Sequence, residues 1–222
     1  MKQIRQILLS GILLFCIAPA IAQGKKYPVA KKAPVATVKK TAFVSPQLRN
    51  FLDITARANV VFNFPKGFKE IPAPDNEDFS FDYAMAIPGE DFEIWFQAKS
   101  QKENYAAFLR TIGNKETGLS DPDSLYVGMG TALAIGFTGD QTGFFVRPIP
   151  AKYLKRYNAD AGRSYLLNLL DLQTTKHYKY GLLITLQKAH TGTILAVCFA
   201  NEKGPEFYKN IDRASNCIKF KP

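Results

Sequence analysis

The segment 178–220 constrains the fold of this chain more than any other stretch. Residues 181–188 and 193–201 flank a short connection that contains Gly192, an arrangement typical of a β-hairpin. The second of these segments is apolar at both parities, and the first contains the run Leu182-Leu183-Ile184. A sheet with one face in water would alternate apolar and polar residues, so we expect both faces of this hairpin to be covered.

A helix and a closing strand are predicted to follow the hairpin. After Gly204-Pro205, apolar residues recur at intervals of four, three and four, which is the spacing of one helical stripe facing a sheet. The stripe consists of Phe207, Ile211, Ala214 and Ile218. Residues 217–220 then form a short final strand.

The rest of the chain shows similar short elements. Helices are predicted at 46–57, 103–114, 151–157 and from Asp121-Pro122 onward, although three glycines weaken the last of these. Strands are predicted at 60–64, 68–71, 79–87 and 92–96, and residues 165–170 read as a strand with a buried helix left open. Two prolines after 144–146 exclude a central strand there. The fold class is therefore α+β, with an antiparallel β-sheet covered by helices on both faces.

The positive charge of the chain is concentrated outside the predicted domain. The 222 residues have a formal net charge of +10, but eight of the 29 Lys and Arg residues and none of the acids lie in residues 1–42. The remainder holds 21 basic and 19 acidic residues, a balance of about +2. Nucleic-acid binding requires a basic face on the folded domain, so this class of partner is not expected.

Three regions are predicted along the chain. Residues 1–22 resemble a secretory signal peptide, with basic Lys2 and Arg5, an apolar run and small residues before a cleavage point after Ala22. Lipid modification at Cys16 is a weaker alternative because bulky Phe15 precedes it. Residues 23–42 form a linker rich in Lys, Pro and Ala, either a solvated spacer or a segment attracted to an anionic surface. Residues 43–222 form a single domain, which we expect in the periplasm or outside the cell.

Two cysteines remain after the predicted cleavage. Cys198 lies on the last long strand and Cys217 at the end of the helix that packs against it. An exported chain meets an oxidising compartment, which favours a disulfide between them as one interpretation. Two buried free thiols are the alternative.

The familiar catalytic and metal-binding motifs do not occur. His177 and His190 have no partner at ligand spacing, and there is no Gly-x-Ser-x-Gly elbow or paired Cys-x-x-Cys. Gly128-Met129-Gly130 lacks the third glycine of a dinucleotide fingerprint, and the acidic loop 75–78 lacks the spacing of a calcium loop. We therefore expect no enzyme activity, no metal and no cofactor.

A polar stretch and a single tryptophan are the candidate binding residues. The stretch runs from Arg156 to Arg163, where Asn and Asp residues favour a structural corner, or alternatively a rim that recognises a polar ligand or partner. Its candidate contact residues are Arg156, Tyr157, Asn158, Asp160 and Arg163. Trp95 is either a core residue or a stacking platform for a sugar or peptide. A small hydrolase is a third hypothesis, which requires His177 to lie beside Asp160.

Both ends of the domain resemble the PsbP-like superfamily, which includes extrinsic oxygen-evolving proteins of photosystem II and Mog-type Ran-binding factors. The residues that carry the resemblance are the Phe-Pro-x-Gly-aromatic opening at 64–68 and the strand–helix–strand close at 194–220. The resemblance implies an α/β/α sandwich and a non-enzymatic role in docking to a larger assembly.

The function expected is therefore that of an exported, non-catalytic binding or accessory domain that docks to a cell-envelope assembly. The alternative is a periplasmic protein that binds a small ligand or a carbohydrate.

Overall fold

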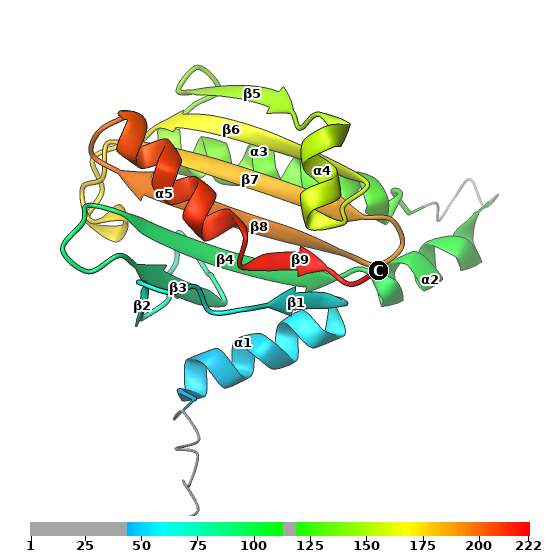
Figure 1. Ribbon diagram of the computed structural model, residues 1–222. Coiled ribbons are helices and arrows are strands. Elements are labelled where there is room, and N and C mark those ends of the chain that lie inside the picture. The colour runs from blue at the N-terminus through cyan, green and yellow to red at the C-terminus, as the bar shows by residue number, and fades with distance from the viewer. Residues whose placement is uncertain (1–43, 113–118) are drawn as a thin grey trace, which may run out of the picture. The chain divides into compact units, whose positions relative to one another are not determined.

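A seven-stranded antiparallel sheet forms the centre of the domain in the computed structural model, which describes residues 44–112 and 119–222 (Figure 1). The strands are β1 Val60–Phe62, β2 Lys69–Ile71, β3 Tyr83–Ala86, β4 Glu93–Ser100, β5 Phe144–Pro148, β6 Ala161–Asn168, β7 Tyr180–Lys188, β8 Gly192–Ala200 and β9 Ile218–Phe220. The order in the sheet is β2-β3-β4-β8-β7-β6-β5, and β1 pairs with β9 in a separate two-stranded ribbon. Residues Ala42–Pro222 form one compact unit, and the predicted leader and linker lie outside the described residues.

Five helices and two short 3-10 turns complete the described chain. The helices are α1 Pro46–Arg57, α2 Lys102–Thr111, α3 Leu125–Thr138, α4 Ala151–Tyr157 and α5 Pro205–Ser215, and the turns are η1 Pro122–Ser124 and η2 Gln173–Thr175. Ser45 caps α1 by accepting a bond from the Leu48 N–H at 3.0 Å, as the Ser-Pro pair predicted. No helix in residues 44–112 or 119–222 is long and apolar enough to cross a bilayer.

The β7–β8 hairpin lies at the centre of the sheet. The prediction that both of its faces are covered is confirmed for β8 but is wrong for β7, where Leu182 and Ile184 are only half-buried. All nine residues of β8 are buried, and the strand pairs with β4 on one side and β7 on the other. Gly192 begins β8 where a Cβ atom would lie 2.8 Å from the Lys99 carbonyl oxygen, so the close approach of β4 requires glycine there.

One face of the sheet, called here the α5 face, carries α1, α4, α5 and the β1–β9 ribbon (Figure 1). Phe51 of α1 stacks on Tyr83, with ring centroids 4.9 Å apart. Phe207 and Ile211 of α5 are buried in the same cluster, which confirms the predicted apolar stripe. Ile218, the last member of that stripe, lies beyond the helix in β9.

The opposite face, called here the α3 face, is covered by α3 (Figure 1). Phe137 of this helix lies against Trp95 and Phe199 of the sheet. The glycines of α3 do not prevent the helix, because Gly130 lets it approach Tyr165 and Thr185 of the sheet. Tertiary packing therefore outweighs the low helix propensity of glycine here.

Two predictions made from the alternating pattern were wrong in part. The run 79–87 is not one strand, because β3 begins at Tyr83 and the preceding residues form a loop with an Asp75–Ser80 bridge. Phe79 and Phe81 consequently pack on the α3 face, whereas Tyr83 and Met85 pack on the α5 face. Residues 165–170 form a strand only as far as Asn168, which excludes the buried helix.

Candidate functional site

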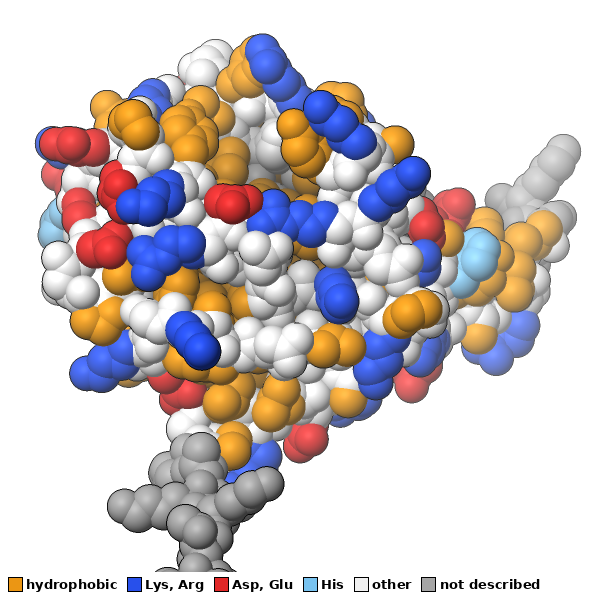
Figure 2. Space-filling view, in the orientation of Figure 1, with side chains coloured by type: hydrophobic (Ala, Val, Ile, Leu, Met, Phe, Trp, Pro, Cys, Tyr) orange, Lys and Arg blue, Asp and Glu red, His pale blue; other side chains and the backbone are white. Residues whose placement is uncertain are grey.

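An apolar stretch of the α5 face lies open beside α4 and extends toward β5. Two adjoining hollows of about 270 and 240 Å³ lie here and share Ser164 and Leu182. Figure 2 shows a depression with apolar side chains over this part of the sheet, where Figure 1 shows α4 and α5 on either side. We call this depression the α4–α5 groove.

The floor of the α4–α5 groove consists of two cross-strand rows of side chains from β6 and β7. Leu166 lies opposite Leu182, and Ser164 lies opposite Ile184. In β8 the same rows continue as Cys198 and Ala196, which are buried in the α5-face core. Leu166, Leu182 and Ile184 are only half-buried, because no described helix covers this end of the rows.

The walls of the groove come from α4 and from β5. On the α4 side they are formed by Ile149, Pro150 and Tyr153, and the Tyr153 side chain is 51% exposed. On the β5 side they are formed by Phe145, which is 57% exposed, and by Arg147. The Arg147 guanidinium lies 4.6 Å from the centre of the Phe145 ring, a cation–π contact.

Arg156 lines the groove and ties its two helices together. Its Nη1 lies 2.8 Å from Asp212 Oδ1, its Nε donates to Asn216 Oδ1 at 2.7 Å, and its Nη2 donates to the Asp212 carbonyl at 3.2 Å. Such a bond pattern holds the end of α4 against the end of α5. Tyr157 also lines the groove, and burial raises the pKa of its phenol, so it stays neutral.

The remaining residues of the predicted 156–163 rim do not face the groove. Asn158 adopts a left-handed conformation at the end of α4 and donates from Nδ2 to the Lys221 carbonyl at 2.6 Å, so it forms a structural corner. Arg163 lies opposite Thr185 and so shares the α3 face of the sheet. The prediction that residues 156–163 form one rim is therefore wrong. Asn158 belongs to a structural corner, and Arg163 lies on the other face of the sheet because successive side chains of a strand point to opposite faces.

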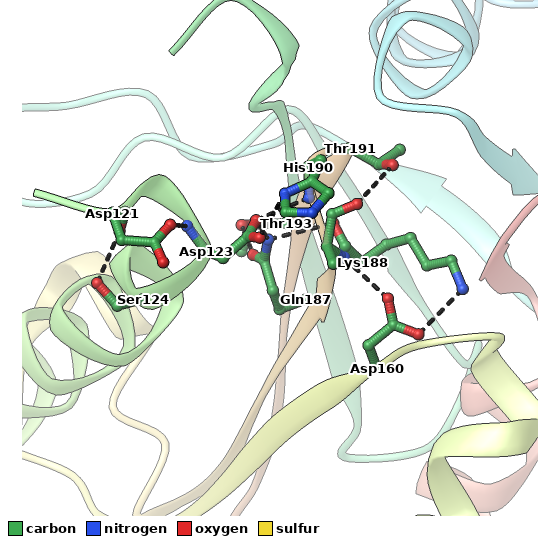
Figure 3. Close-up of polar contacts among 10 residues, drawn as sticks. Asp121, Asp123, Ser124, Asp160, Gln187, Lys188, His190, Thr191 and Thr193 are labelled. Atoms are coloured by element: carbon green, nitrogen blue, oxygen red, sulfur yellow. Dashed lines mark hydrogen bonds and ion pairs between the residues drawn. The ribbon is translucent and has the colours of Figure 1, made fainter. Parts of the chain in front are cut away.

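Asp160 anchors the turn of the β7–β8 hairpin (Figure 3). Its Oδ2 accepts the Ala189 N–H at 2.9 Å, and its Oδ1 lies 3.1 Å from Lys188 Nζ. Burial by itself raises the pKa of this carboxyl, but the Ala189 N–H and the Lys188 ammonium outweigh it and hold the pKa below its usual value.

A polar cluster that the sequence analysis missed lies beside this turn (Figure 3). Asp123 Oδ1 accepts bonds from the His190 N–H at 2.8 Å and from Gln187 Nε2 at 2.9 Å, while Asp123 Oδ2 lies 2.8 Å from His190 Nδ1. Gln187 Oε1 in turn accepts the Thr193 hydroxyl at 2.6 Å. The Tyr105 ring of α2 stacks on the His190 ring at 3.8 Å.

This cluster connects distant parts of the chain. A carboxylate bound to one ring nitrogen of a histidine also occurs in acid–base catalysis, where the second nitrogen faces a nucleophile. The nearby Ser124 hydroxyl instead donates to the Asp121 carbonyl, so it stays within its own turn. The arrangement thus fastens η1 and α2 to the hairpin. No sequence signal could have revealed it, because Asp123 and His190 are 67 positions apart.

The structure does not form the predicted hydrolase pair or the predicted stacking platform. His177 Nδ1 lies 2.6 Å from Asp171 just before β7 begins, whereas Asp160 contacts Lys188 at the opposite end of β7. The hydrolase hypothesis requires these two residues side by side, and a strand of this length separates them. Trp95 is 1% exposed and donates from Nε1 to Glu93 Oε2, so burial excludes it as a stacking platform.

Cys198 and Cys217 are buried free thiols in the structure. Within the described ranges, no group of three or more His, Cys, Asp or Glu side chains could hold a metal ion. Another hollow, about 540 Å³, is lined in part by the acidic residues Glu90, Asp91, Glu202 and Glu206. Glu90 already accepts a bond from Asn210 and pairs with Arg213, so part of this charge is satisfied internally.

Comparisons with known proteins assign no family. No protein-family model matches the chain, and no curated protein matches it. The function is therefore inferred from the geometry of the site.

Proposed function

We propose that this chain is an exported, non-catalytic binding domain that docks to a larger assembly of the cell envelope. In this proposal the α4–α5 groove receives an extended, apolar segment of the partner protein. The observation that carries the proposal is the open floor of Leu166, Leu182 and Ile184 on a face that helices otherwise cover. Contiguous apolar surface of this kind, with polar residues around it, is typical of interaction sites.

The dimensions of the groove favour a protein segment over a small molecule. Pockets for small ligands usually enclose about 300–1,000 Å³ and bury most of the ligand. Each hollow of the groove is smaller, and the two are arranged side by side along the sheet. An extended segment can place successive side chains in the two adjoining hollows.

The charges around the groove indicate an acidic residue in the bound segment. Arg147 lines the groove and pairs with no carboxylate among the described residues, while Arg156 is already bound to Asp212. A carboxylate beside Arg147 would add an ion pair at the rim, which contributes more to orientation than to affinity.

The resemblance to PsbP-like proteins supports the same proposal. It implies an α/β/α sandwich that docks to an assembly without catalysis, and the antiparallel sheet agrees with the coarser part of that expectation. Fold alone does not establish function, so the resemblance adds to the argument from the groove but does not replace it.

Site-specific photo-crosslinking tests the proposal directly. A benzophenone amino acid would replace Tyr153 in the wall of the groove or, as a matched control, Tyr208 on α5, which is equally exposed at 50% against 51%. In cells that export the protein, we expect one defined partner to be captured from position 153 and not from 208. Equal capture from both positions, or none from 153, would contradict the proposal.

Binding of the purified partner provides the second test. Leu182→Asp places a charge in the floor of the groove and should weaken binding by about tenfold or more. Leu109→Asp on α2, where the leucine is 51% exposed and outside the groove, should leave binding unchanged. Melting curves of both variants separate lost binding from lost folding.

A further inference from the structure

β5 is an edge strand that pairs with β6 on one side and with no described strand on the other. β5 is the last strand in the sheet, and residues Phe145 and Val146 are 57% and 38% exposed. Figure 1 shows no described element beyond it. An edge of this kind presents unpaired backbone N–H and C=O groups to solvent.

The hydrogen bonds to β6 determine which backbone groups face outward. The Ile149 N–H bonds to the Gly162 carbonyl and the Asn168 N–H to the Gly143 carbonyl, both at 2.9 Å. In an antiparallel pair such residues alternate, so Phe145 and Arg147 also bond inward to β6. The backbone groups of Phe144, Val146 and Pro148 consequently point away from the sheet.

Pro148 lies at one of the outward positions. Its missing N–H therefore costs no bond to β6, which is why a proline is compatible with this strand. The central outward residue, Val146, keeps both its N–H and its carbonyl free for another strand.

We propose that two copies of this chain associate through β5, in antiparallel register centred on Val146. In that register the Val146 N–H of each copy donates to the Val146 carbonyl of the other, and each Phe144 N–H donates to the opposing Pro148 carbonyl. A two-fold axis perpendicular to the sheet relates the two copies, as is usual for homodimers. The two seven-stranded sheets then form one continuous sheet.

The side chains of β5 favour this register over its neighbours. Phe145 of one copy lies opposite Arg147 of the other, at the close spacing of a pair without hydrogen bonds. Arg147 already contacts the Phe145 ring of its own chain at 4.6 Å, so the same cation–π chemistry extends across the interface. A shift of the register by one step would place Arg147 opposite Arg147, which is repulsive. The opposite shift would leave Pro148 beyond the end of the other strand.

Dimerisation of this kind has a geometric consequence for the α4–α5 groove. A two-fold axis perpendicular to the sheet keeps the α5 faces of both copies on the same side. Each groove reaches Phe145 of β5, so in the dimer both grooves lie beside the interface between the two copies. The self-association does not depend on the function proposed for the groove.

Sedimentation of residues 23–222, the form expected after leader cleavage, tests the inference over a range of concentrations. The wild-type chain should convert from monomer to dimer as its concentration rises. Val146→Pro removes the outward N–H without removing a bond to β6, and we expect it to remain monomeric at the same concentrations. Val146→Thr keeps both the N–H and the branched side chain, and should dimerise like the wild type.

Amide hydrogen exchange of the wild-type chain gives a readout that needs no substitution. The amides of Phe144 and Val146 should become protected as the concentration rises, because they bond across the interface. Those of Phe145 and Arg147 bond to β6 and should be protected at every concentration. A wild-type chain that is monomeric throughout, or a dimer in which the Phe144 and Val146 amides stay unprotected, would overturn the proposal.

Discussion

Asp160 shows how a single exposed carboxylate can hold a hairpin in place. It accepts a backbone N–H from the turn and pairs with Lys188 of β7, although its side chain is 48% exposed. Water and salt screen an ion pair of this exposure, so its contribution to stability is small.

Asp160→Asn should lower the free energy of unfolding at neutral pH by about 0.5 kcal/mol, because the amide loses the pairing with Lys188. The pKa of Asp160 is lowered from 3.8 in the folded state, so its stabilising effect exists above that value and disappears as the pH falls through the lowered pKa. Denaturant unfolding at several pH values should show the difference between the two proteins shrinking as the pH falls below 3.8. A difference that stays constant with pH would contradict this account.

The two thiols differ from Asp160 in that they are fully enclosed. Burial raises the pKa of Cys198, and it raises the pKa of Cys217 to about 12, so neither forms a thiolate at physiological pH. We expect residues 23–222 to show no reaction with a disulfide thiol reagent when folded. Unfolding without reductant should expose two reactive thiols. A bridged pair would instead react only after reduction, which would establish the disulfide that the sequence left open.

At the scale of elements, helix α3 shows that one glycine can be essential where another is dispensable. A Cβ atom at Gly130 would lie 2.7 Å from Thr185 Cγ2 and 2.8 Å from Tyr165 Oη, whereas a Cβ atom at Gly128 would meet nothing within 4 Å. The first glycine permits close packing on the sheet, and the second has no such role.

Gly130→Ala should destabilise the domain by about 1–3 kcal/mol, because the sheet would have to move away from the helix. Gly128→Ala should instead stabilise it by about 0.5–1 kcal/mol through better helix propensity. The midpoints of urea unfolding measure both effects on the same helix. Equal stabilisation by the two substitutions would show that α3 does not pack as closely as described.

At the scale of the whole domain, the β1–β9 ribbon joins the two ends of the described fold. Val60 pairs with Phe220, and Phe62 pairs with Ile218, although these residues come from opposite ends of the domain. Phe220 is completely buried in the α5-face core, so the last residues of the chain contribute to the same core as α1.

Phe220→Ala should cost about 3–5 kcal/mol, the usual range for a buried aromatic side chain that leaves a cavity. The neighbouring Lys219→Ala is the matched control, because Lys219 is exposed on the same strand and should change stability by at most about 0.5 kcal/mol. Calorimetry should show a single transition in both variants if the ribbon unfolds with the rest of the domain. An unchanged melting temperature in Phe220→Ala would mean that the ribbon does not belong to the core.

Most of the fold could be predicted because the relevant signals are local. The bounds of α4 and the start of α1 match the expected residues, and the hairpin lies where Gly192 indicated. The alternation over 79–87 failed because period-two patterning does not reveal where a chain leaves a sheet. Phe79 and Phe81 show the strand pattern but cross to the other face.

The candidate site was less predictable than the fold. Arg156 and Tyr157 were identified and do line the α4–α5 groove, but the floor residues Leu166, Leu182 and Ile184 were not. In sequence these three residues are indistinguishable from core positions. Only the positions of α4 and α5 on the sheet show that they are left uncovered.

The sequence by itself determined most of the strands and helices, and that both faces of β8 are covered, because hydrophobic period and turn chemistry act over a few residues. The tertiary structure alone decided the open groove, the outward backbone of β5 and the Asp123–His190 contact. These features depend on which distant segments lie side by side, and no local pattern records that.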